Sequence, residues 1–132
     1  MSNIVVIDDS LTVRAIIEQI LHKERDLVVI GSASDVPGAR ALIERYHPSV
    51  ITLDLAMPGI DGMAFLDELA GQPHAPVVVL SSHTIAGSDA ERAALDRGAA
   101  ACFDKAQLVR QGGKFARVIR HAIKTAHPRK AA

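Results

Sequence analysis

The stretch IVVIDDS, residues 4–10, decides the fold class of this chain. Its four apolar β-branched residues follow one another without polar alternation, which is typical of a parallel strand buried on both faces. Asp8 and Asp9 come at once afterwards, at the carboxyl end of the predicted strand, and Ser10 is a good N-cap residue. The stretch therefore predicts a buried strand, a polar turn and then a helix.

The same order of strand and helix recurs along the whole chain. Apolar runs of strand length occupy residues 4–7, 27–31, 50–54, 77–81 and 101–103. Helical periodicity follows each run, and the last helix is expected over about residues 113–127. Such strict alternation implies parallel strands with right-handed crossovers. The prediction is an α/β fold, a five-stranded doubly wound parallel sheet in a three-layer sandwich.

Composition narrows the classes of function. The chain has 132 residues, which fits one domain, and its formal net charge is zero, so no overall field favours nucleic acid or membrane surfaces. It contains no Trp, one Tyr and three Phe, so the rings on which bases stack are scarce. Cys102 is the single cysteine and excludes an internal disulfide. Without a signal peptide or a membrane-spanning apolar run, we expect a cytoplasmic protein.

Reactive side chains gather where the predicted strands end. Asp8 and Asp9 follow the first strand, Asp54 ends the third, Ser81 ends the fourth, and Lys105 comes just after the fifth. Open parallel sheets bind ligands beyond the carboxyl ends of their strands. Three carboxylates at one edge repel one another and need a cation, and Mg²⁺ is the hard ion that prefers such oxygen ligands. The pattern indicates an acidic metal-binding pocket.

This pocket has the parts needed for phosphoryl transfer to a side chain. A carboxylate can act as a nucleophile and form an aspartyl phosphate, so Asp54 is the candidate acceptor. A metal and Lys105 would neutralise charge on the transferred group, and Ser81 could donate a hydrogen bond to it. Each residue alone has a simpler explanation: Ser10 as an N-cap, Asp61 as a helix start, Lys105 as a solvated side chain. Their joint placement favours a site.

These residues resemble a known family, the receiver domains of two-component response regulators. The resemblance runs from Ile4 to about Ala126 and rests on VIDDS at residues 6–10, on Asp54 with MPGIDG at residues 57–62, on Ser81 and on Lys105. It implies a flavodoxin-like sheet with strand order 2-1-3-4-5. It also implies a response regulator that accepts a phosphoryl group on Asp54 in a Mg²⁺-dependent reaction, with Mn²⁺ as an alternative metal.

The resemblance further assigns roles and partners. The metal ligands would be the carboxylates of Asp8, Asp9 and Asp54 and the backbone carbonyl of Ala56. Ser81 would be the switch hydroxyl and Lys105 the phosphate contact. A sensor histidine kinase or phosphotransfer protein would supply the phosphoryl group. Signalling to an unknown protein target would use the face of the fourth helix, fifth strand and fifth helix. No nucleic acid, membrane or enzyme activity beyond self-phosphorylation and dephosphorylation is implied.

A finer similarity points to the receiver of the chemotaxis methylesterase, through DSLTVR at residues 9–14, VITLD at 50–54 and VVLSSHT at 78–84. We expect residues 1–126 to form a stand-alone receiver and 127–132 a short basic tail, without an output domain. Two positions depart from the family. Cys102 stands where many receivers have an aromatic ring, and Ala106 replaces the proline that usually follows the lysine.

Several alternatives stay open at this point. A haloacid-dehalogenase-like phosphatase would carry a second Asp at position 56, where this chain has Ala56, and no phosphate-binding glycine motif follows the first strand. Within the receiver interpretation, the chain could be a switch, a phosphoryl shuttle or sink without a dedicated target, or a phosphorylation-inactive interaction module. A basic face near the last helix either is solvated or docks an acidic partner. Its residues are Lys114, Arg117, Arg120, Lys124, Arg129 and Lys130.

Overall fold

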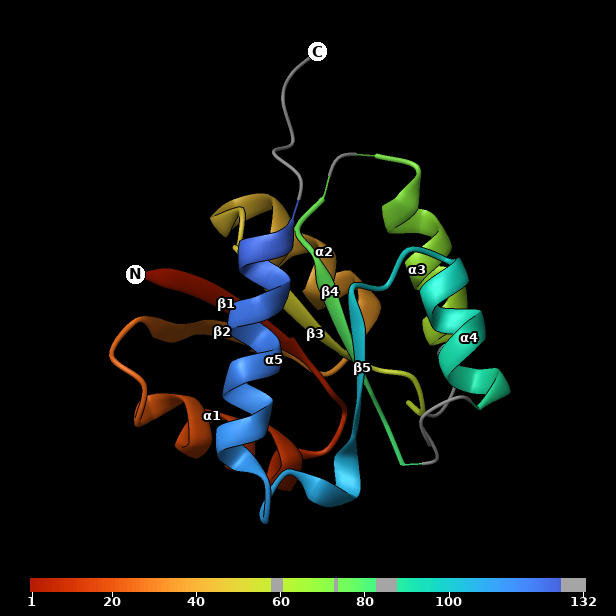
Figure 1. Ribbon diagram of the computed structural model, residues 1–132. Helices are drawn as coiled ribbons and strands as arrows, with labels where there is room; N and C mark the ends of the chain where they lie inside the picture. The colour runs from red at the N-terminus through yellow and green to blue at the C-terminus, as the bar shows by residue number, and fades with distance from the viewer. Residues whose placement is uncertain (58–60, 73, 83–87, 127–132) are drawn as a thin grey trace.

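Five parallel strands form one sheet, as the computed structural model of the chain shows (Figure 1). The structure describes residues 1–57, 61–72, 74–82 and 88–126. In chain order the elements are β1 (Ser2–Ile7), α1 (Leu11–His22), β2 (Leu27–Ala33), α2 (Val36–Tyr46), β3 (Val50–Asp54), α3 (Gly62–Ala70), β4 (Val77–Ser81), α4 (Asp89–Asp96), β5 (Ala101–Asp104), the 3₁₀ turn η1 (Lys105–Gln107) and α5 (Gly112–Thr125). The strand order is β2-β1-β3-β4-β5, with every neighbouring pair parallel. The predicted α/β fold and strand order are confirmed.

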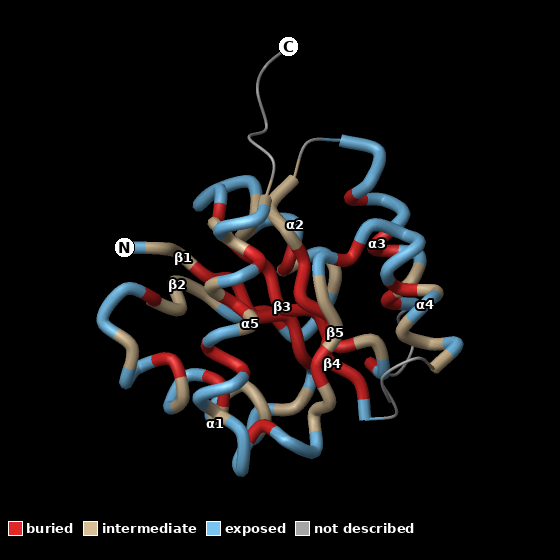
Figure 2. The backbone as a smooth tube through the Cα atoms, in the orientation of Figure 1, coloured by how far each residue is buried: buried red, intermediate tan, exposed pale blue. Residues whose placement is uncertain are grey.

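Two apolar clusters lie on opposite faces of the sheet. Ile4 and Val6 of β1 pack under α1 and α5, whereas Val5 and Ile7 pack under α2, α3 and α4. This alternation follows from the two-residue period of a strand. Figure 2 shows that the buried residues are concentrated in the central strands. All five residues of β3 and of β4 are buried, which explains why the sequence shows these strands as mostly apolar and without polar alternation.

The boundaries of several elements differ from the prediction by one or two residues. β1 and β2 are longer than expected, because their backbones pair from Ser2 with Leu27 as far as Ile7 with Ala33, with a register shift between Ile4 and Val5. Backbone pairing does not require apolar side chains, so the polar ends of these strands gave no signal in the sequence. The last helix begins at Gly112 and ends at Thr125, and residue 127, its predicted end, lies outside the described residues.

Side-chain caps start the helices that leave the carboxyl edge of the sheet. The Ser10 hydroxyl oxygen accepts a hydrogen bond from the N–H of Val13 and caps α1. The Asp61 carboxylate accepts from two backbone N–H groups, those of Met63 and Ala64, and caps α3. The predicted capping roles of Ser10 and Asp61 are confirmed. Each cap satisfies N–H groups that a helix end leaves unpaired.

Exposed ion pairs join the outer helices to one another. Arg40 of α2 donates to Glu68 of α3 at 2.6 and 2.5 Å, and Arg120 of α5 donates to Asp26 before β2. The hydrogen bond from Arg120 lowers the pKa of Asp26 to about 2. Such exposed pairs contribute little to stability, because water and salt screen them. The basic residues Lys114, Arg117 and Lys124 of α5 are exposed, whereas Arg129 and Lys130 lie outside the described residues.

Within the described part of the chain, none of the helices has both the length and the apolar character that crossing a bilayer requires.

The hydroxyl of Thr52 in β3 is a buried polar group whose removal should stabilise the fold. Thr52 is fully buried, and its hydroxyl oxygen has no hydrogen-bond partner among the described residues. An unpaired buried polar group costs stability, so Thr52→Val, which has the same shape, should raise the free energy of unfolding by about 1 kcal/mol. Urea unfolding monitored by circular dichroism measures this change. Thr52→Ser keeps the hydroxyl but loses a methyl group, and should destabilise the fold. A destabilised Thr52→Val would show that the hydroxyl is satisfied by a buried water.

Candidate functional site

Two acids and a lysine meet at the carboxyl edge of the central strands. Asp8 follows β1 directly, Asp54 is the last residue of β3, and both are almost completely buried. Because β1 pairs with β3, these two strand ends lie side by side in the sheet. Lys105 follows β5 and reaches across to them from the first position of η1. The topology thus converts three distant stretches of sequence into one pocket.

Lys105 bridges the two buried carboxylates. Its Nζ lies 2.9 Å from Asp54 Oδ2, to which it donates a hydrogen bond, and 3.3 Å from Asp8 Oδ2. The lysine side chain is only 15% exposed, so the ion pairs are largely shielded from water. One ammonium group therefore faces two carboxylates, and the pocket keeps an excess of negative charge when all three groups are ionised.

Three carboxylates are close enough to share one metal ion. Asp8, Asp9 and Asp54 each offer an oxygen, and these oxygens lie within 4.8 Å of one another. Asp8 Oδ2 is buried and forms an ion pair with Lys105, but it accepts no hydrogen bond from the described residues, so it still has a lone pair to offer a cation. Clustered carboxylate oxygens with an unsatisfied buried acceptor fit a hard divalent cation such as Mg²⁺. Asp9 is exposed, so the pocket opens to solvent on its side.

Hydrogen bonds fix the orientation of the two buried acids. Asp8 Oδ1 accepts from the N–H of Ser10 at 2.8 Å, which leaves its other oxygen facing the pocket. Asp54 Oδ1 accepts from the N–H of Ala56 at 3.0 Å, so the chain after β3 folds back over the acceptor carboxylate. Ala56 therefore lies beside Asp54 through its N–H. Its carbonyl, which the family resemblance implies as a metal ligand, stays a prediction.

Electrostatics in the pocket favour binding of a cation. Burial raises the pKa of Asp8, and the neighbouring Asp54 charge raises it further, against the lowering effects of the Ser10 N–H and of Lys105. Burial lowers the pKa of Lys105, but its hydrogen bond to Asp54 and its attraction to both acids outweigh this effect, so the pKa lies above its ordinary value. The lysine therefore stays charged, while Asp8 carries a cost for being ionised that a metal ion would relieve.

Ser81 lies at the same edge of the sheet. It ends β4, is only 7% exposed, and pairs in register with Asp104, the residue before Lys105. The adjacent position of β4, Leu80, pairs with Asp54. The prediction placed Ser81 with the acids and the lysine at one sheet edge, and the register agrees with this arrangement. His83 and Gly87, which the sequence places in the following loop, lie outside the described residues.

The turn after β5 explains the departure at position 106. Asp104 Oδ1 accepts a hydrogen bond from the N–H of Ala106 at 2.9 Å and caps η1, the turn that carries Lys105. Proline has no N–H to donate and could not form this hydrogen bond, whereas Ala106 can. The local geometry that directs Lys105 into the pocket thus depends on a side-chain cap.

The departure at position 102 changes which face of β5 carries an aromatic ring. Cys102 is half-buried and packs with the cluster under α2, α3 and α4. Burial, together with the Glu91 charge, raises the pKa of its thiol to about 11. The next residue, Phe103, points to the other face and contacts Phe115 of α5 at a ring distance of 5.2 Å. The only ring of β5 is therefore a core residue beneath α5.

Arg14 at the pocket was not singled out by the sequence. Its Nη1 donates a hydrogen bond to the backbone carbonyl of Asp8 at 2.5 Å. The residue lies in the DSLTVR stretch, at a position that the N-cap at Ser10 places in the first turns of α1. A long side chain can turn in many directions, so the sequence alone does not show that this guanidinium points back to β1.

Comparison with known proteins agrees with this geometry. The model of the family described as the response regulator receiver domain matches residues 4–111. A protein-glutamate methylesterase/protein-glutamine glutaminase of Burkholderia thailandensis is 36% identical over 128 residues, which cover 96% of this chain and 36% of that protein. A similarly named protein of Dechloromonas aromatica is 41% identical over 98 residues, covering 74% of this chain and 28% of that protein. The chain spans about a third of the length of these relatives.

Solved structures show the same similarity. The response regulator domain of Thermotoga maritima CheB superposes with a TM-score of 0.88 and 26% identity, covering 96% of this chain and 99% of that one. A chain in the complex between the P1 domain of CheA3 and CheY6 from R. sphaeroides superposes with a TM-score of 0.80 and 28% identity, covering 94% of this chain and 98% of that one. The similarity inferred from sequence, to receivers of the chemotaxis methylesterase type, is confirmed.

The crowded carboxylates yield a prediction about stability. Asp8→Asn keeps the acceptor for the Ser10 N–H and removes one buried negative charge. In metal-free buffer at neutral pH, the midpoint of thermal unfolding should rise, by about 4 °C for each kcal/mol gained in a chain of this size. Saturating Mg²⁺ should reduce the difference, because the wild type gains the free energy of metal binding.

Asp96→Asn, at an exposed acid of α4, is the matched control and should change neither midpoint. If the metal-free midpoint of Asp8→Asn fell instead, the attraction between Asp8 and Lys105 would outweigh the burial of Asp8 and its repulsion by Asp54.

Proposed function

The chain belongs to the response regulator receiver domain family, and from this premise we propose that Asp54 accepts a phosphoryl group from a histidine kinase or a phosphotransfer protein. The observation that carries the proposal is the Asp54 carboxylate, which is buried at the end of β3, held by the Ala56 N–H and paired with Lys105. A buried nucleophilic carboxylate that keeps a cation beside it suits transfer of an anionic group.

We infer the following course for the transfer. An Asp54 carboxylate oxygen attacks the phosphorus of a phosphohistidine, the new O–P bond forms, and the P–N bond breaks with its electron pair returning to the imidazole nitrogen. Lys105 moves with the developing charge and forms an ion pair with a phosphoryl oxygen. Ser81 donates a hydrogen bond to another phosphoryl oxygen and so acts as the switch hydroxyl. These are positioning and charge-neutralising roles, as in other phosphoryl transfers.

Asp8, Asp9, Asp54 and the carbonyl of Ala56 would hold Mg²⁺, or Mn²⁺ in its place. The bound metal would supply neutralisation of charge on the transferred oxygens. The support for this part of the proposal is the 4.8 Å grouping of the three acids and the buried Asp8 Oδ2, which accepts no hydrogen bond from the described residues. We assign residues 1–126 to the receiver and place the protein in the cytoplasm, where ATP-dependent kinases work.

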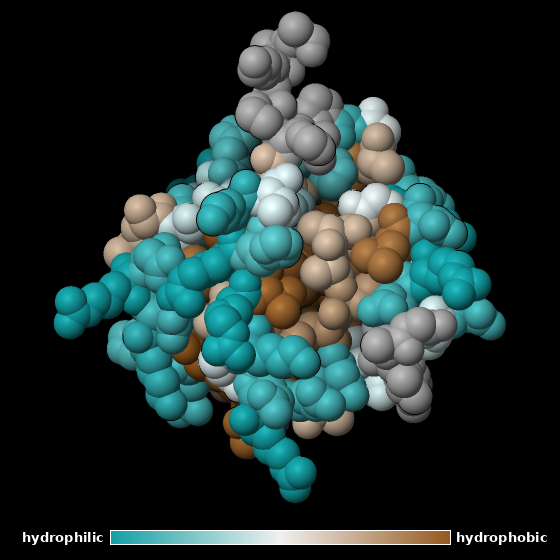
Figure 3. Space-filling model, viewed as in Figure 1, coloured by the Kyte–Doolittle hydropathy of each residue, from teal (hydrophilic) through white to brown (hydrophobic). Residues whose placement is uncertain are grey.

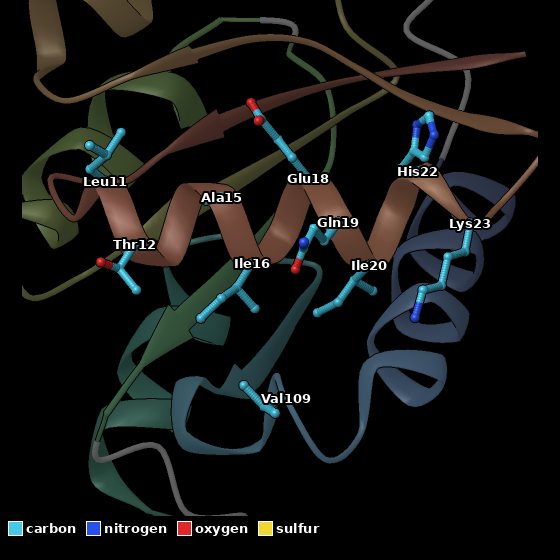
Figure 4. A pocket seen from close by; sticks show the side chains of 10 residues that line it. All are labelled: Leu11, Thr12, Ala15, Ile16, Glu18, Gln19, Ile20, His22, Lys23 and Val109. Carbon is cyan, nitrogen blue, oxygen red and sulfur yellow. The ribbon is translucent and has the colours of Figure 1, made fainter.

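A groove along α1 begins at Leu11, two residues after Asp9, and is the surface that we propose for the phosphoryl donor. Figure 4 shows Ile16 and Ile20 of α1 facing Val109, which lies between η1 and α5. Leu11 and Val109 are 74% and 76% exposed, which is unusual for large apolar side chains. Because α1 starts two residues after Asp9, a donor seated in this groove would bring its histidine to Asp54. The related CheY6 chain is in complex with a P1 domain of CheA3.

The face formed by α4, β5 and α5 is the proposed signalling surface. In Figure 3 apolar side chains show among the polar ones on the side of the molecule that carries these elements. Leu95 of α4 is 43% exposed, and Cys102 of β5 is half-buried. Ser81 is paired with Asp104 at the end of β5, so a shift of Ser81 toward a phosphoryl group would displace this strand as well.

Phosphorylation by a small-molecule donor tests the proposal. After incubation with acetyl phosphate and Mg²⁺, intact-mass spectrometry should show a gain of one phosphoryl group on the wild type and none on Asp54→Asn. Removal of Mg²⁺ with a chelator should abolish the gain, because the pocket then repels the incoming anion. Lys105→Ala should also reduce it.

Asp67→Asn is the matched control, since Asp67 lies in α3 and pairs with Arg97 away from the pocket. Beryllofluoride binding, followed by NMR, separates rapid hydrolysis from failure to react. If the wild type neither gains mass nor binds beryllofluoride, the protein is not a phosphoacceptor.

The Cys102 thiol reports on the signalling face. With a pKa of about 11, against 9.0 for an ordinary thiol, the thiolate fraction at pH 8 is lower by about 100-fold in the folded protein. Alkylation by iodoacetamide should therefore be slow at pH 8, accelerate as the pH rises toward 11, and be much faster in urea. Mass spectrometry measures the rate.

Beryllofluoride should change this rate at pH 8 if activation rearranges β5. An unchanged rate would count against signalling through this strand. Cys102→Ser, followed by NMR, provides the complementary test: loss of its phosphorylation-dependent shifts would show that the thiol itself is part of the switch, rather than the Ser81 loop and the last helix.

A further inference from the structure

The geometry points to Arg14 as a positioning residue for the metal-binding acids. We propose that its guanidinium fixes the peptide group between Asp8 and Asp9, and so holds the exposed Asp9 carboxylate where a divalent cation requires it. The inference rests on the proposed Mg²⁺-dependent function and adds a residue outside the ligand set to it.

Arg14 reaches backwards from α1 to the end of β1. Its own N–H donates to the carbonyl of Ser10 at 3.0 Å, in the first turn of the helix. Its Nη1 donates to the carbonyl of Asp8 at 2.5 Å. The hydrogen bond of the side chain thus links residue 14 back to residue 8, and Asp9 lies in the short segment between them. A guanidinium bonded to a carbonyl oxygen is a charge-assisted hydrogen bond, stronger than one between neutral groups.

The other hydrogen bonds of Asp8 in the described part of the chain involve its N–H and its carboxylate, whereas Arg14 binds its carbonyl. The Asp8 N–H donates to the carbonyl of Ala33 at 3.0 Å, and Asp8 Oδ1 accepts from the Ser10 N–H at 2.8 Å. These bonds fix Asp8 itself. Among the described residues, the Asp9 side chain takes part in no hydrogen bond or ion pair, so its position follows from the backbone that carries it. That backbone is anchored on one side by Arg14.

The sign of the effect separates positioning from simple electrostatics. A positive charge near three carboxylates repels a metal cation, so removing Arg14 would strengthen Mg²⁺ binding if charge were its only influence. If Arg14 positions Asp9, its removal lets the peptide rotate and weakens Mg²⁺ binding. Residues that orient metal ligands typically change affinity by about 10- to 100-fold. Because Asp9 is one of several ligands, we expect the lower end of this range.

Titration calorimetry with MgCl₂ tests the inference on the full chain. Arg14→Ala should bind Mg²⁺ about 10-fold more weakly than the wild type, and Arg14→Lys, which keeps the charge and one donor, should recover part of the loss. Arg40→Ala is the matched control, because Arg40 pairs with Glu68 on the surface of α2 and α3. It should bind Mg²⁺ like the wild type. Thermal unfolding in metal-free buffer confirms that each variant is folded.

Equal or tighter Mg²⁺ binding by Arg14→Ala would overturn the inference and leave the proposed function intact. Failure of the wild type to bind Mg²⁺ would overturn the proposed function, and the inference with it. If the Arg14→Ala variant does not fold, the inference can still be tested on the wild type by NMR. The Arg14 guanidinium protons should exchange with solvent more slowly in NMR spectra than those of exposed Arg117. Equally fast exchange would show that the hydrogen bond to Asp8 is not maintained, and would also overturn the inference.

Discussion

The contact between Lys105 and two buried carboxylates is the constraint on which the rest of the pocket depends. Asp8 and Asp54 are withdrawn from water at neighbouring strand ends, where two negative charges cannot both persist without a cation. Lys105 compensates one of them. Burial, with a smaller contribution from the Asp54 charge, raises the pKa of Asp8 despite the nearby lysine, so the ionised pair of acids stays unfavourable. A pocket with residual negative charge and a carboxylate oxygen that still has a lone pair to offer fits a divalent metal. In the proposed function, the bound metal would let this pocket accept an anion.

The parallel fold brings the residues of this pocket together from distant parts of the sequence. Parallel strands place all their carboxyl ends at one edge, and the order β2-β1-β3-β4-β5 puts β1, β3 and β4 next to one another there. Long crossovers are required between parallel strands, and the helices that form them cover both faces. The consequence is a sheet without polar alternation, so its central strands lie in the core and cannot move independently. The parts that the core constrains least are therefore the loops and helix starts beyond the strand ends and the edge strands β2 and β5.

The sequence predicted the parts of this arrangement that depend on local patterns. Unbroken apolar runs located the strands, and Ser10 and Asp61 located two helix starts, because capping is a matter of neighbouring residues. The grouping of Asp8, Asp54 and Lys105 was predictable from topology alone. Contacts that depend on how a long side chain bends were not, as Arg14 shows. The polar ends of β1 and β2 were also missed, since backbone pairing leaves no trace in hydrophobicity.

The aromatic ring of β5 sets a limit on how a signal can leave the pocket. Phe103 packs against Phe115 in the core under α5, so it cannot swing between buried and exposed positions without opening that core. Cys102, on the other face, is too small to move a surface by rotation. In the proposed function, a change at Ser81 would therefore reach α4 and α5 through the backbones of β4 and β5, which are paired from Val78 with Ala101 to Ser81 with Asp104. Backbone displacement moves every residue of a short edge strand together. For this chain we infer that β5 and the turn that carries Lys105 would shift together, because the Asp104 carboxylate at the end of β5 caps that turn.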